Sequence, residues 1–138
     1  MIDLTFEYWN KLATHMITIS SLLGGFSIAV VANHLVSEVN TKLLKSVMAS
    51  SVLAASFFII SIFSMTKIFF ITTSGYPFKV EASEIIFPRI AGASSFFLGI
   101  LFLLGIVALS GWTKSKNMGR FTTFFAVLTF IILLVLTS

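Results

Sequence analysis

Cysteine is absent from this 138-residue sequence, and only 10% of its residues are charged. The lack of cysteine excludes disulfide bonds and thiolate metal sites. With 57% hydrophobic residues and a mean hydropathy of +1.06, the chain has too little polar surface for a water-soluble domain of this size. We therefore expect an integral multi-pass membrane protein, located in a plasma membrane or a bacterial inner membrane.

Several functional classes also lack the residues that they require. The net charge of +4 is small and dispersed, which is typical of loop charges that orient a membrane protein and not of a nucleic-acid-binding surface. No cluster of His, Asp or Glu has the spacing of metal ligands, and no Ser/His/Asp arrangement or phosphate-binding glycine loop occurs. We predict neither an enzyme nor a metal or cofactor site.

Four apolar segments are long enough to cross a bilayer as helices, which takes about 20 residues each. These segments are residues 12–36, 46–71, 90–112 and 121–137. The sequence thus predicts an all-α fold with a single four-helix transmembrane domain over residues 1–138.

The ends of the spans carry further signals. Residues 1–12 place apolar side chains on one helical face, which predicts a short amphipathic segment at the membrane surface. Pro88 lies just before the third span, where its missing N–H costs little. The two loops on one side of the membrane hold Lys42, Lys45, Lys114, Lys116 and Arg120. Because basic loops favour the cytoplasm, this count places both chain termini outside.

The middle of the first span reads SSLLGGFSIAVVANHL (residues 20–35) and contains small and polar residues that a simple anchor does not need. On a helix of about 3.6 residues per turn, one narrow stripe collects Thr14, Thr18, Ser21, Gly25, Ala29 and Ala32, with Asn33 at its edge. Leu22 and Phe26 flank this stripe, and the rest of the helix is bulky and apolar. Two interpretations are open: packing inside a four-helix bundle, or the lining of a pore formed by several copies of this helix.

The third span fits the packing role. Ala91, Ser95 and Gly99 recur at four-residue spacing, a pattern that lets helix backbones approach closely in lipid. Neither the second nor the third span carries an ionisable residue at its centre. This absence counts against a proton-coupled or substrate-coupled transporter.

These segments resemble the Orai family, the pore subunits of calcium-release-activated calcium channels. The first span is similar to that family's pore helix, LLKSVMASSVLAASFF (residues 43–58) to its second span, and GILFLLGIVALSGWTK (residues 99–114) to its third. The resemblance covers roughly residues 14–114. It implies an ion channel whose first helix lines a central axis, with a cytosolic N-terminus, and we expect a homo-oligomer, a pentamer or hexamer.

Carried over by position, the pore-lining residues of the family fall on Thr18, Leu22, Phe26, Ala29 and Asn33. The resemblance implies that Phe26, together with Leu22, forms a hydrophobic barrier, and that Gly25 is a hinge beside it. The permeant ions are then small ions, and we expect cations.

Three departures from the family change this expectation. Asn33 stands where the family has a ring of glutamates, and a ring of amides carries no net charge, so strong calcium selectivity is not expected. Thr18 replaces a basic residue, and Ile106 replaces an acidic one. The sequence ends at Ser138, so the segment that docks the activating partner in the family is not expected, and gating is assigned to an unidentified partner or to the membrane lipid.

Other classes stay open. A membrane effector or an accessory subunit, acting as a toxin-like pore or as an anchor, would have the same spans. A small four-span glutathione transferase needs clustered arginines, which Arg89 and Arg120 alone do not provide. A small multidrug exporter needs a buried carboxylate in its first span, and none is present there.

Overall fold

The structure is a computed structural model that describes residues 6–36, 41–73, 75, 77 and 83–137. Within these residues the chain forms four helices, α1 (Phe6–Leu35), α2 (Lys42–Ile71), α3 (Ser83–Trp112) and α4 (Lys116–Thr137). All four are long and apolar enough to cross a membrane. The all-α fold with four candidate spans is therefore confirmed.

All four helices begin earlier than the spans predicted from the sequence, and α1 and α3 differ most. Helix α1 is continuous from Phe6, so residues 6–12 form its first turns and lead directly into the span, while residues 1–5 lie outside the described residues. Helix α3 begins at Ser83, which places Pro88 inside its second turn and not before the helix. The proline removes one intrahelical hydrogen bond, the one that its own missing N–H would donate.

Short polar residues mark where α2 and α4 begin. The hydroxyl oxygen of Thr41 accepts a hydrogen bond from the Leu44 N–H at 3.2 Å, and that of Ser115 accepts one from the Met118 N–H at 3.1 Å. Both side chains cap N–H groups that have no partner within the helix. The turn between α3 and α4 is closed by a backbone bond from Lys114 N–H to Gly111 O at 3.1 Å.

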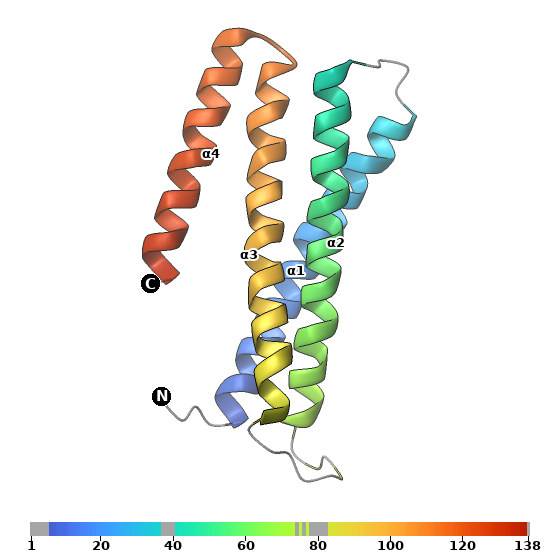
Figure 1. Ribbon diagram of the computed structural model, residues 1–138, viewed down its shortest axis with the longest axis vertical. Helices are drawn as coiled ribbons and strands as arrows, with labels where there is room; N and C mark the ends of the chain where they lie inside the picture. The colour runs from blue at the N-terminus through green and yellow to red at the C-terminus, as the bar shows by residue number, and fades with distance from the viewer. Residues whose placement is uncertain (1–5, 37–40, 74, 76, 78–82, 138) are drawn as a thin grey trace.

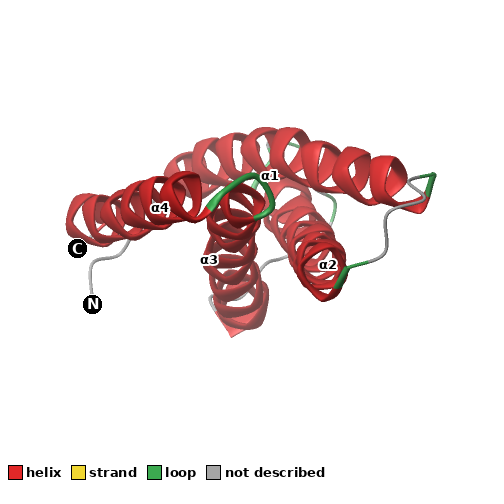
Figure 2. Cartoon of the chain, turned by 90° about the horizontal axis from the view of Figure 1, so that it is seen from above, coloured by secondary structure: helices red, strands yellow, loops and turns green. Residues whose placement is uncertain are grey.

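Helices α2 and α3 lie side by side, α1 crosses behind them at a tilt, and α4 stands at the edge (Figures 1 and 2). Helix α1 packs mainly on α2, whereas α4, among the described residues, packs on α3 alone. The C-terminal ends of α1 and α3 therefore meet the N-terminal ends of α2 and α4 at one end of the molecule, the upper end in Figure 1.

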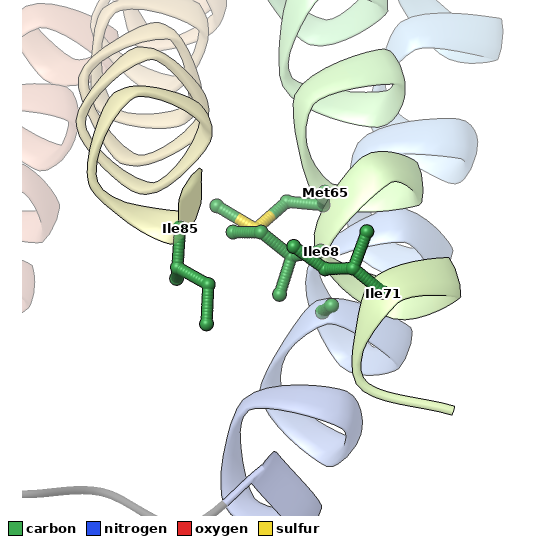
Figure 3. Packing of buried hydrophobic residues seen from close by; sticks show 5 residues of the cluster. Met65, Ile68, Ile71 and Ile85 are labelled. Atoms are coloured by element: carbon green, nitrogen blue, oxygen red, sulfur yellow. The ribbon is translucent and has the colours of Figure 1, made fainter. Parts of the chain in front are cut away.

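Buried apolar side chains form two clusters along α2. The lower one joins Met65, Ile68 and Ile71 of α2 to Ala13 and to Ile85 of α3, as Figure 3 shows for the labelled residues. The upper one joins Val47, Ala54 and Phe58 of α2 to Ile106 of α3. A continuous side of α2 is thus the common partner of α1 and α3.

Close approach to α2 depends on glycine on both sides of Phe58, whose side chain is fully buried. A Cβ added at Gly24 of α1 would lie 3.3 Å from Phe58 Cβ, and one added at Gly99 of α3 would lie 2.8 Å from Phe58 Cε1. Ser95 and Gly99 are buried, which agrees with their predicted packing role, whereas Ala91 is half-buried.

Polar contacts hold the lower end together. The Asn10 side-chain amide lies within hydrogen-bond distance of Phe69 O (3.0 Å), Thr72 Oγ1 (3.3 Å) and Thr73 Oγ1 (3.1 Å), so its two N–H groups can donate to two of these at once. These contacts fix the start of α1 to the last turn of α2.

Candidate functional site

The five predicted pore residues share one exposed face of α1. Leu22 is 71% exposed and Phe26 55% exposed, and Thr18, Ala29 and Asn33 are exposed as well. The other members of the predicted stripe are exposed too: Thr14, Ser21, Gly25 and Ala32. Within the described part of the chain, the stripe is therefore not used for packing one helix against another.

The hydroxyl groups on this face bond within their own helix. Thr14 Oγ1 donates to Asn10 O at 2.9 Å, Thr18 Oγ1 to Thr14 O at 2.9 Å, and Ser21 Oγ to Ile17 O at 2.7 Å. Each proton is thereby satisfied without a second helix. The hydroxyl oxygens keep lone pairs that can accept a hydrogen bond or contact a cation.

A second face of α1, which the sequence analysis missed, packs on α2. It consists of four small residues, all buried: Ala13, Ser20, Gly24 and Ser27. Ser20 Oγ lies 3.4 Å from Ser61 Oγ of α2, and Ser27 Oγ donates to Leu23 O at 3.0 Å. The spacing of seven, four and three residues is that of a helix–helix seam, and it is the signal that could have revealed this face.

The exposed stripe and the buried face lie on different sides of α1, and Ala29 of the stripe lies opposite Ser20 of the buried face. Ala29 follows Ser20 by nine residues, which is two and a half turns of a helix with about 3.6 residues per turn. Packing within one chain thus explains the small residues of the buried face. It does not explain those of the exposed stripe.

The adjacent glycines belong to different faces. Gly24 lies against Phe58, whereas a Cβ added at Gly25 would meet no other heavy atom within 4 Å. Helix α1 runs unbroken through Gly25. Its predicted hinge role stays a prediction, and packing inside the chain does not require glycine there.

An open groove of about 480 Å³ lies between α1, α3 and α4 near the upper end. Phe26 and Asn33 belong to its α1 wall, so these two predicted pore residues sit at the border between the exposed stripe and the groove. The full lining is Phe26, Val30, Asn33, His34, Ile106, Val107, Ser110, Gly111, Lys114, Met118 and Thr122. The His34 ring donates from Nδ1 to Val30 O at 2.8 Å, which fixes its orientation at this wall.

Metal-binding groups and paired arginines are two further kinds of site to consider among the described residues. These residues contain no group of three His, Cys, Asp or Glu side chains that could hold a metal ion. Arg89, whose guanidinium lies 5.5 Å from the Trp9 ring centroid, is near the lower end, and Arg120 is in α4 at the upper end. One chain therefore does not bring these two arginines together around a carboxylate, as a glutathione site would require.

No protein-family model, curated protein or solved structure matches this chain. The resemblance to the Orai family accordingly stays a prediction drawn from residues 14–114. The membrane in which the protein resides and its orientation there stay predictions as well.

Proposed function

We propose that the chain is the subunit of a homo-oligomeric membrane channel in which copies of α1 surround a central axis. One observation supports this proposal: the small and polar stripe of α1 is exposed and lies on a different side of the helix from the face that packs on α2. The arrangement leaves α1 one face for its own subunit and another for its copies.

The chemistry of the stripe supports contact between copies over contact with lipid. An amide left without partners in hydrocarbon costs several kcal/mol, about 4–8 on a water-to-cyclohexane scale. Asn33 is exposed near the upper end of α1, and contact with other copies of α1 would give its amide polar partners. Gly25, Ala29 and Ala32 carry little or no side chain, which allows several α1 backbones to approach each other.

The order of residues along α1 supplies the parts of a passive pore. Phe26 and Leu22 form an apolar barrier that excludes water while it is narrow. Asn33 lies seven residues above Phe26, about 10 Å along the helix, and contributes a neutral ring of amide dipoles at the upper mouth. A neutral ring passes small ions, with cations favoured by the amide oxygens, and does not bind calcium strongly.

Ion flux through purified protein in liposomes tests this proposal. Replacing Phe26 by alanine is expected to raise flux about tenfold or more, which corresponds to a barrier lower by about 1.4 kcal/mol. The matched control is Phe63→Ala, since Phe63 is also an exposed phenylalanine, at 72%, but on α2. We expect F63A to conduct as the wild type does.

The selectivity of the same preparation tests the role of Asn33. In Asn33→Asp a ring of carboxylates replaces the amides, so permeation should shift toward divalent cations. The proposal fails if wild type, F26A and N33D all remain impermeable while the protein is oligomeric. That outcome would favour the accessory-subunit alternative, in which the stripe binds another protein.

A further inference from the structure

We infer that the groove between α1, α3 and α4 binds an anionic phospholipid, with one acyl chain along the groove and the phosphate at Lys114. The inference concerns a lipid site on each subunit and does not depend on conduction through the assembly.

The walls of the groove suit a hydrocarbon chain. Four lining residues outside the proposed pore face have apolar side chains: Val30, Ile106, Val107 and Met118. The volume of about 480 Å³ lies within the range of small-molecule sites in proteins, about 300–1,000 Å³. Because α4 packs on α3 alone among the described elements, the groove is open sideways between α1 and α4, the side that faces lipid when these helices cross a membrane.

The rim of the groove is basic. Lys114 belongs to the lining and lies two residues beyond Trp112, the last residue of α3, at the upper end of the molecule. The other described basic residues at this end stand at the starts of α2 and α4: Lys42, Lys45, Lys116 and Arg120. The acidic residues in the described part of the chain, Glu7 and Glu84, lie in the first turns of α1 and α3, at the lower end. Among the described residues, the charge at this end is therefore positive and complements an anionic headgroup.

Charge also argues against a second copy of the chain as the occupant. In a ring around an axis normal to the membrane, all upper ends lie on the same side. A neighbouring copy would thus bring its own basic end to Lys114, and the described residues offer no carboxylate there to pair with it. A phosphate supplies the negative charge and strong acceptor oxygens that a lysine needs at the edge of a bilayer.

Native mass spectrometry of the detergent-purified protein tests the site. The protein is titrated with phosphatidylglycerol and with phosphatidylcholine that carry the same acyl chains, and the bound lipids are counted. We expect tighter binding of phosphatidylglycerol. The change Lys114→Gln should weaken that binding about fivefold, the effect of one basic residue near an anionic lipid surface, and leave phosphatidylcholine unchanged. Lys67→Gln is the control, since Lys67 is exposed near the lower end of α2.

A second pair of variants tests the groove itself. Val107→Trp fills the groove and should block both lipids, whereas Val127→Trp, at an exposed α4 position outside the lining, should block neither. Equal effects of K114Q and K67Q would overturn the inference, because they indicate attraction to net charge alone. Unchanged lipid binding in V107W would also overturn it. So would the absence of bound lipid together with loss of the oligomer in V107W, since the groove then holds a neighbouring copy.

Discussion

The adjacent glycines Gly24 and Gly25 test the assignment of one side of α1 to packing on α2 and another side to the exposed stripe. Leucine at position 24 adds a side chain whose first carbon already lies 3.3 Å from Phe58 Cβ, and whose remaining carbons must enter space that fully buried Phe58 occupies. Leucine at position 25 adds the same atoms where nothing lies within 4 Å of the first carbon. The two variants have the same composition and differ only in the face that is altered.

The structure predicts a large effect on the free energy of unfolding for one variant and a small effect for the other. Overpacking of a well-packed site costs about 1–3 kcal/mol, so Gly24→Leu should lower the free energy of unfolding of the subunit by that amount. Gly25→Leu creates no clash inside the chain, so its effect should stay within about 0.5 kcal/mol. The usual gain in helix propensity on replacing glycine is small here, because membrane-spanning helices persist when a bundle separates in lipid.

Two measurements separate the outcomes. Unfolding of the subunit in mixed micelles, titrated with a denaturing detergent, reports the stability of the bundle, and cross-linking in liposomes reports the oligomer. We expect Gly25→Leu to leave unfolding unchanged and to abolish both the oligomer and the ion flux, because a leucine on the stripe keeps the α1 helices apart. If G25L destabilises the subunit as much as G24L, the assignment of faces is wrong. If G25L instead leaves assembly and flux intact, the stripe does not line an axis.

The remaining predictions concern packing and hold for the subunit alone. Gly99→Ala should cost about 1–3 kcal/mol in the same unfolding assay, because its Cβ would lie 2.8 Å from a Phe58 ring carbon. Gly105→Ala is the matched control, with no heavy atom within 4 Å and an expected change within about 0.5 kcal/mol; equal effects would contradict the packing at Gly99. Asn10→Ala should cost about 1 kcal/mol, since interhelical hydrogen bonds in membranes contribute about 0.6 kcal/mol each and the amide can donate two. An N10A protein as stable as the wild type would show that Phe69 O and its neighbours do not hold α1.

The spans follow from hydropathy alone, because a segment of about 20 apolar residues has few stable states other than a membrane helix. Helix ends are harder to predict, and Pro88 shows the reason. In a sequence, a proline predicts the end or the start of a helix. Within an early turn of α3, however, Pro88 removes a single backbone hydrogen bond, and its ring is buried.

The sequence predicts the position of the exposed stripe on α1, and its role in a pore stays a prediction. The stripe through Thr18 and Ala29 could be found from spacing, because it depends only on the geometry of one helix. Spacing could also reveal the buried face, but it could not show which of the two faces packs on α2, since only the position of Phe58 on that helix distinguishes Gly24 from Gly25. The groove at Lys114 has no local signal at all, because it arises from the separation between α4 and α1.

The helices differ in length, and this difference sets how the molecule sits in a bilayer. With a rise of about 1.5 Å per residue, the 30 residues of α1, α2 and α3 span about 45 Å each, whereas the 22 residues of α4 span about 33 Å, close to the thickness of the hydrocarbon layer. Helix α4 starts level with the others and stops well short of their lower ends (Figure 1). When α4 crosses the bilayer, the extra 12 Å or so of each of the other three helices is accommodated by tilt or by extension into the headgroup region. The contacts of Asn10 with Phe69 and of Arg89 with Trp9 lie in this lower part, so extension would bring them to the headgroups on that side of the membrane.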